Sequence, residues 1–155
     1  MQQSADRQGA DRQSAEPQSA EQLKAKVRDY VERIWNRKEL DALDELASAD
    51  YRRHLGPSEP SIDRAAQKLR LQSLQRALPD VHFSIDDLIA EGDRVVFRVT
   101  VRATQRGDMF GVAATGKAVA FSAIDILRFE GGRIVEHWGF GDSAALLRQL
   151  GKIPG

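Results

Sequence analysis

The residues best suited to chemistry in this chain are one aspartate and one histidine near its C-terminal end. Asp125 is the one acid in the otherwise apolar run over residues 119–129, where it shares a face with Phe121 and Leu127. His137 follows in the next run of alternating residues. A carboxylate beside an imidazole is suited to acid/base chemistry, because the carboxylate fixes the imidazole tautomer and apolar walls hold both pKa values near neutrality.

Whether these two side chains meet depends on the turn at residues 130–132, which reads Glu-Gly-Gly. A three-residue loop with a bulge places Asp125 opposite His137, and we favour this register. A register shifted by one places Trp138 opposite Asp125 and turns His137 away. The competing interpretation of Asp125 is a structural ion pair with an arginine.

Composition limits the other chemistry that is open to the chain. Its 155 residues include 23 basic and 23 acidic side chains and no cysteine. Neutral charge argues against nucleic acid and anionic membrane surfaces as partners, and missing cysteine excludes disulfides, thiolate metal sites and a cysteine nucleophile. No two histidines have metal-ligand spacing, so we expect no metal. The pattern of a signal peptide is also absent, which predicts a cytoplasmic protein.

The composition changes at about residue 20. The first 22 residues contain six glutamines and no Leu, Ile, Val, Phe, Tyr or Trp. Such a segment cannot bury enough apolar surface to offset the entropy of ordering, so we expect a disordered tail over residues 1–20 and one domain over residues 21–155. Ser19 and Gln22 have the spacing of a capping box at the start of the first helix.

Hydrophobic periodicity predicts three helices before any strand. The first ends near Asn36, the second carries Leu40 and Leu43, and the third is expected to be capped by Ser61 and stopped by Pro79. From there the period of two predicts an antiparallel meander, and a last helix spans residues 143–150. This order describes an α+β domain in which helices cover one face of a curved sheet and leave a pocket beneath them.

Three segments of the chain resemble the SnoaL-like polyketide cyclase family of the NTF2-like superfamily: GDRVVFRVTVRATQRGDMFG, ATGKAVAFSAIDILRFEGGRIVEHW and LLRQLG. The resemblance runs from about Leu23 to Gly151. It implies a cone-shaped α+β barrel, with three N-terminal helices packed on a curved antiparallel sheet around an apolar cavity, assembled as a homodimer or larger homo-oligomer. In the best-known members the cavity closes a polyketide ring by intramolecular aldol condensation, without metal or cofactor.

Two positions depart from the family pattern. Residues 104–107 read Thr-Gln-Arg-Gly where the family often has Thr-His-x-Gly. Residues 136–139 read Glu-His-Trp-Gly where Glu-His-Trp-Asp is common, and the aspartate there is the residue implicated as general acid/base in the aldol cyclases. Gly139 cannot transfer a proton, and we expect the next acid, Asp142, to cap the last helix.

We therefore expect a cofactor-independent acid/base catalyst of aldol-type cyclisation or isomerisation that acts on a small apolar carbonyl compound. Asp125 and His137 would move the proton. The alternative is a non-catalytic ligand-binding or dimerising NTF2-like module, which the glycine at 139 favours. For Tyr51 and His54 a core tyrosine and a surface histidine are the competing interpretation. The residues expected to bind substrate are Tyr51, His54, Gln105, Phe121, Leu127 and Trp138.

Overall fold

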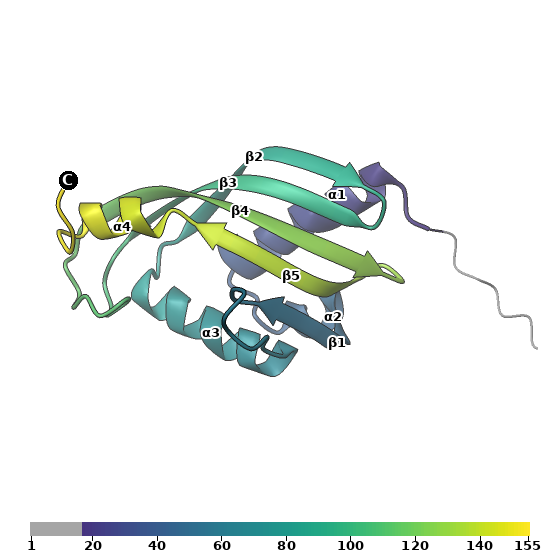
Figure 1. The fold of residues 1–155 in the computed structure, drawn as a ribbon, viewed down its shortest axis with the longest axis horizontal. Coiled ribbons are helices and arrows are strands. Elements are labelled where there is room, and N and C mark those ends of the chain that lie inside the picture. Colours follow the sequence, from purple (N-terminus) through teal and green to yellow (C-terminus); the bar gives the residue numbers. More distant parts are fainter. Residues whose placement is uncertain (1–16) are drawn as a thin grey trace, which may run out of the picture.

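The computed structural model describes residues 17–155, which form a curved five-stranded sheet with helices against its concave side (Figure 1). Most of the segment expected to be disordered, residues 1–16, lies outside the described residues. No helix of the described part is long and apolar enough to cross a membrane. The elements in chain order are α1 (Ala20–Tyr30), η1 (Val31–Asn36), α2 (Ala42–Leu46), β1 (Ala47–His54), α3 (Arg64–Ala77), β2 (His82–Glu91), β3 (Arg94–Thr104), β4 (Ala118–Glu130), β5 (Arg133–Gly141) and α4 (Ser143–Gln149).

The N-terminal helix begins as its sequence predicts. The Gln22 amide donates to the Ser19 hydroxyl at 3.2 Å, and the Ser19 amide donates to the Gln22 side chain at 2.9 Å, so the capping box is confirmed. Leu23, Val27 and Tyr30 form the buried stripe of α1. The helix then widens into the π-helical turn η1, which carries Trp35.

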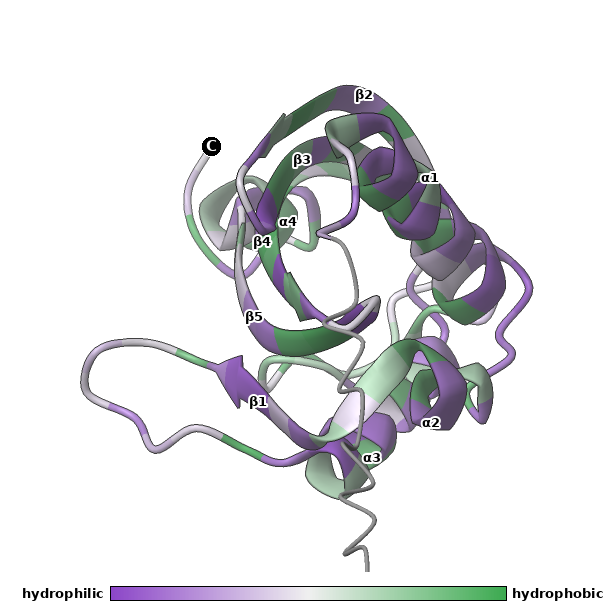
Figure 2. Ribbon diagram, turned by 90° about the vertical axis from the view of Figure 1, so that its right-hand side faces the viewer, coloured by the Kyte–Doolittle hydropathy of each residue, from purple (hydrophilic) through white to green (hydrophobic). Residues whose placement is uncertain are grey.

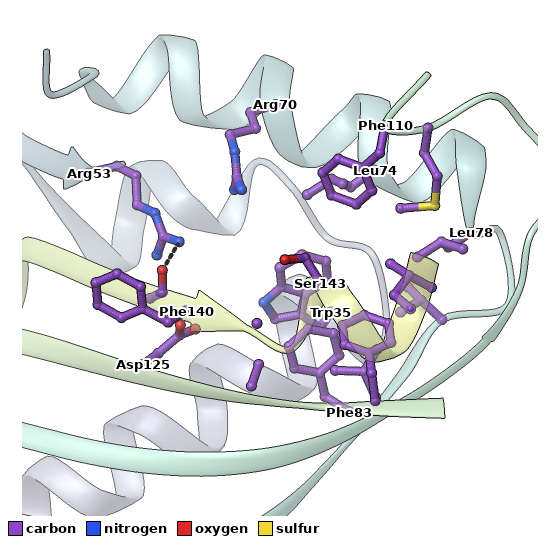
Figure 3. Close-up of a pocket in the computed structure, with 18 residues that line it drawn as sticks. Trp35, Arg53, Arg70, Leu74, Leu78, Phe83, Phe110, Asp125, Phe140 and Ser143 are labelled. Atoms are coloured by element: carbon purple, nitrogen blue, oxygen red, sulfur yellow. Dashed lines mark hydrogen bonds between the residues drawn. The ribbon is translucent and has the colours of Figure 1, made fainter. Parts of the chain in front are cut away.

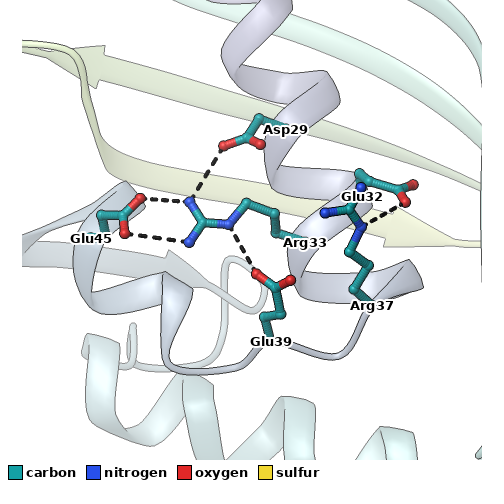
Figure 4. Close-up of polar contacts among 6 residues, drawn as sticks. All are labelled: Asp29, Glu32, Arg33, Arg37, Glu39 and Glu45. Carbon is teal, nitrogen blue, oxygen red and sulfur yellow. Dashed lines mark hydrogen bonds and ion pairs between the residues drawn. The ribbon is translucent and has the colours of Figure 1, made fainter.

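Arg33 joins η1 to the short helix α2 (Figure 4). Its guanidinium contacts Asp29 at 3.6 Å, Glu39 at 3.1 Å, and Glu45 in α2. Because these carboxylates come from three successive parts of the chain, the arginine fixes the bend between η1 and α2 and directs the chain into β1.

The expectation of three helices before any strand is wrong, because β1 precedes α3. The sequence of β1, ASADYRRH, is largely polar, and it is a strand because it pairs in parallel with β5 at the sheet edge. Ser61 does not cap α3 either: Ile62 exchanges two 2.9 Å backbone hydrogen bonds with Arg53, and the cap is Asp63, which accepts from the Ala66 amide at 2.8 Å.

The sheet has the order β1-β5-β4-β3-β2, in which β2 to β5 form an antiparallel meander. Along β3 buried and more exposed residues alternate, as the period of two predicts. The sheet curls around α1, with α2 and α3 beside β1 (Figure 2). Asp142 caps α4 as expected, since it accepts from the Ala145 amide at 2.9 Å. The predicted α+β class is therefore confirmed.

The predicted register of the β4–β5 hairpin is wrong. Glu130 pairs with Arg133, so Gly131 and Gly132, with φ angles of 55° and 79°, form a two-residue loop rather than a three-residue one. The bulge lies further along, at Val135, because Phe129 pairs with Ile134 while the preceding residue of β4 already pairs with Glu136. In consequence Asp125 lies opposite Gly139, and His137 lies opposite Leu127.

Candidate functional site

A pocket of about 300 Å³ lies between the concave face of the sheet, α3 and η1 (Figure 3). Most of its wall is apolar, and Trp35 and Phe83 stack within it with their ring centres 4.2 Å apart. Its charged side chains are Arg53, Arg70 and Asp125. Such a chamber suits a small, largely apolar molecule with a few polar groups.

Asp125 projects from the middle of β4 into this pocket (Figure 3). Its side chain is nearly buried, and its backbone pairs with that of Gly139 on β5. A Cβ atom added to Gly139 would collide with the Asp125 Oδ1 atom and would lie 2.7 Å from the Arg53 Nη2 atom. The Asp125 carboxylate therefore fills the space that a side chain at 139 would need.

His137 lies beside this carboxylate and away from the pocket lining. Its Nε2 atom is 3.3 Å from the Asp125 Oδ2 atom, which is ion-pair distance without hydrogen-bond alignment, and its Nδ1 atom is 3.0 Å from the Tyr51 hydroxyl. The predicted meeting of carboxylate and imidazole thus occurs, but diagonally across the hairpin rather than between directly opposed residues.

Burial lowers the pKa of His137 to about 4, and the positive charge of Arg53 acts in the same direction. The expectation of a pKa near neutrality is therefore wrong for this residue, because the imidazole is removed from water beside a guanidinium. A neutral imidazole has one N–H group. Placing it on Nε2 leaves Nδ1 to accept the proton of the Tyr51 hydroxyl and directs the N–H toward the side of the imidazole on which the Asp125 carboxylate lies.

Two arginines complete the charged end of the pocket. Arg53 on β1 is 6% exposed, and its only side-chain hydrogen bond among the described residues is a long one to the Gly139 carbonyl, at 3.5 Å. Arg70 reaches the same space from α3 (Figure 3). Sequence reasoning missed both residues. The available signal was weak, namely the alternation of Tyr51 and Arg53 in a segment that was not recognised as a strand.

Of the six residues expected to bind substrate, the pocket lining includes Phe121 alone. Tyr51 and Leu127 are fully buried beside His137. Tyr51 is therefore a core residue, as the competing interpretation has it, and its hydroxyl forms a hydrogen bond with the His137 imidazole.

His54 and Trp138 lie together, outside the lining of the pocket. Their rings stack with centres 4.8 Å apart, and the His54 Nε2 atom is 2.8 Å from a Glu136 carboxylate oxygen. Arg94 lies over the Trp138 ring at 5.1 Å. Trp138 lies outside the pocket lining because the bulge at Val135 determines which β5 side chains face the pocket.

Gln105 is buried and braces the loop that follows β3. Its amide nitrogen donates to three backbone carbonyls of residues 107–113, each at 3.2 Å, and its oxygen accepts from the Thr115 amide at 3.0 Å. The same loop carries Met109 and Phe110 to the pocket. Gln105 therefore supports the pocket wall from behind.

The model of the SnoaL-like polyketide cyclase family matches residues 25–150. The chain belongs to this family. AclR from Streptomyces galilaeus, described as a candidate hydroxylase, is 32% identical over 88% of this chain and 85% of its own, with a TM-score of 0.79. TsrD from Streptomyces laurentii is 25% identical over 88% and 99%, with a TM-score of 0.78. IdmH from Streptomyces antibioticus, a candidate polyketide cyclase, is 29% identical over 82% and 96%, with a TM-score of 0.72.

No curated protein matches the chain. The family assignment confirms the NTF2-like fold that the sequence resemblance implied, with the difference that β1 is inserted between the second and third helices. The names of the structural relatives include both a hydroxylase and cyclases. Family membership therefore leaves the reaction to be argued from the pocket itself.

Proposed function

We propose that this protein is a cofactor-independent acid/base catalyst, in which the Asp125 carboxylate removes a proton from the carbon next to a carbonyl group of a small, largely apolar compound. The observation that supports this most directly is the position of Asp125. Among residues 17–155 it is the one carboxylate that lines an otherwise mostly apolar pocket. A base held among apolar walls is poorly solvated and can reach the carbon acid without intervening water.

His137 acts in this proposal as a positioning residue. The neutral imidazole lies outside the pocket lining and cannot touch the substrate. Its Nε2 atom faces the Asp125 carboxylate, and Tyr51 fixes the tautomer from the other side. The pair holds the carboxylate in one orientation, which is what a base needs for proton transfer along a defined line.

Arg53 supplies the positive charge for the enolate that proton removal creates. Its terminal nitrogens lie on the same side of Gly139 as the Asp125 carboxylate, so negative charge that develops on the carbonyl oxygen meets a guanidinium that is already in place. The enolate carbon then forms a carbon–carbon bond with a second carbonyl of the same molecule, and the resulting alkoxide takes the proton back from Asp125. Return of the proton to another carbon instead gives an isomerisation.

The test is exchange of α-protons in deuterated buffer, followed by proton NMR with 2-tetralone as the probe ketone. The wild-type protein should accelerate the exchange, and Asp125→Asn should reduce the rate by about 100-fold or more, the usual contribution of a general base. Asp50→Asn is the matched control, because Asp50 is an exposed acid on β1 outside the pocket.

Two results would contradict the proposal: exchange no faster than in buffer alone, or equal rates for the wild type and Asp125→Asn. Either would favour the alternative of a non-catalytic ligand-binding NTF2-like module. Circular dichroism and urea unfolding of Asp125→Asn show whether the variant is folded, so that a loss of exchange is assigned to the missing carboxylate.

A further inference from the structure

The pocket holds more positive than negative charge. In the part of the chain that the structure describes, its lining includes the guanidinium groups of Arg53 and Arg70 and a single carboxylate, that of Asp125. His137 does not change this balance, because its lowered pKa keeps it neutral at pH 7. One positive charge is therefore left over in a chamber whose remaining wall is mostly apolar.

Neither arginine has a carboxylate at ion-pair distance within the described residues, although the Asp125 carboxylate lies near Arg53. The Arg53 Nε atom is buried without a hydrogen-bond partner, and neither guanidinium forms an ion pair. Arg64, on the same helix as Arg70, shows the contrast, since it pairs with Asp44 at 3.3 Å. Burial and the neighbouring charge of Arg53 lower the pKa of Arg70 below its ordinary value. Positive charge removed from water and offset by only one carboxylate is unfavourable, so an anion that enters here would be stabilised by both groups.

We propose that the substrate carries a carboxylate group, which Arg70 binds at the charged end of the pocket, with Arg53 shared between this group and the carbonyl oxygen beside Asp125. This inference rests on the proposed function for the place of the reacting carbonyl, beside Asp125. The two side chains come from different elements, β1 and α3, and both enter the same space (Figure 3). The planar guanidinium group matches the two oxygens of a carboxylate.

The charge balance favours a carboxylate over a phosphate. A single negative charge offsets the one positive charge that Asp125 leaves over, whereas a phosphate dianion would place uncompensated negative charge next to Asp125. The aromatic wall formed by Trp35, Phe83 and Phe121 then receives the apolar body of the substrate. The proposed substrate is thus a small aromatic or alicyclic keto acid rather than a neutral ketone.

The test compares two probes of nearly equal shape, 2-naphthoate and its methyl ester, by isothermal titration calorimetry. The wild type should bind the carboxylate at least tenfold more tightly than the ester. Arg70→Gln should weaken naphthoate binding at least tenfold and ester binding less than twofold. Arg76→Gln is the matched control, since Arg76 is exposed on the same helix and outside the pocket lining. Its affinities should equal those of the wild type.

Three outcomes would overturn the inference: equal affinity for the two probes, equal weakening of both in Arg70→Gln, or no saturable binding of naphthoate at millimolar concentration. Arg70→Gln is the variant chosen for the test because Arg70 is only partly buried. Folding should therefore depend less on Arg70 than on the buried Arg53. Neither naphthoate probe carries a ketone, so their binding does not depend on proton abstraction by Asp125. A failure of proton abstraction is therefore seen separately from a failure of carboxylate binding.

Discussion

Asp125 and Gly139 are complementary residues on neighbouring strands. The family resemblance places an acid at position 139, and this chain has glycine there, yet a carboxylate from β4 occupies the adjacent space. Within the described residues, the carboxylate that lines the pocket therefore comes from β4 and not from position 139. This geometry also explains why 139 is a glycine, because any Cβ at this position would collide with the carboxylate.

The Asp125 carboxylate should make a side chain at position 139 destabilising. Gly139→Ala should destabilise the protein by about 1–3 kcal/mol, the usual cost of adding a methyl group to a closely packed place. Urea unfolding at pH 7 measures the change. Gly141→Ala is the control, since its Cβ would find only a Phe121 ring carbon at 3.8 Å, an ordinary contact.

The double variant Asp125→Gly/Gly139→Ala shows whether the collision with Asp125, rather than another feature of position 139, makes a side chain there destabilising. With the carboxylate removed, the cost of the alanine should fall by more than half. An unchanged cost would mean that the Asp125 side chain is not what excludes a side chain there, and the idea of complementarity would have to be abandoned.

At the scale of elements, the β4–β5 hairpin and the loop between β3 and β4 determine which side chains line the pocket. The bulge at Val135 sets which residues of β5 face Asp125. The loop between β3 and β4 contributes Met109 and Phe110 to the wall, and the buried amide of Gln105 holds it. The glutamine stands where the family often has a histidine, and its role in this chain is to satisfy backbone groups rather than to contact a substrate.

Gln105→Ala should release the loop without unfolding the protein. Several backbone carbonyls would lose their donor, and one such loss costs about 1–3 kcal/mol. Amide hydrogen exchange of residues 107–116 should accelerate about tenfold or more, whereas exchange in α1 should be unchanged. Hydrogen exchange with mass spectrometry measures both regions.

Arg106→Ala is the control for this variant, because Arg106 is the exposed neighbour of Gln105. It should exchange like the wild type. Equal acceleration in both variants would show that the loop depends on its general sequence rather than on the buried amide.

At the scale of the whole molecule, the parallel pairing of β1 with β5 assembles the site. Tyr51 and His137 are 86 residues apart in sequence, and this pairing brings their side chains to 3.0 Å. The same pairing carries Arg53 into the pocket and buries His137 away from water. The buried imidazole thereby links global stability to pH.

Unfolding should become easier as the pH falls from 6.5 toward 4.5. The pKa of His137 is about 4 in the folded protein and 6.5 as its ordinary value. In that window the unfolded chain binds more protons, so stability is complete above pH 6.5 and declines as the pH falls. Lowering the pKa from 6.5 to about 4 corresponds to a loss of about 3 kcal/mol when the imidazole is fully protonated.

Urea unfolding at pH 7.0, 6.0 and 5.0 tests this dependence. His137→Gln should remove most of the slope, whereas His82→Gln, at an exposed position on β2, should keep it. If the slope of His137→Gln equalled that of the wild type, the pH dependence would have to come from other groups.

Most elements with local signals were predicted correctly from the sequence alone. The capping box at Ser19, the cap at Asp142 and the strands with a period of two depend on residues within a few positions of one another. Asp125 could be singled out in the same way, as one acid in an apolar run. The strand β1 could not, since its sequence has no apolar alternation and becomes a strand only beside β5.

The sequence by itself determined the fold class and the family, and it predicted that Asp125 and His137 lie close together, because these depend on local pattern and on motif order. Only the tertiary structure decided the hairpin register, the neutral state of His137 and the presence of Arg53 and Arg70 in the pocket. The physical reason is that burial and charge balance depend on segments far apart in the chain. A buried arginine looks like a surface arginine until the strand beside it is known.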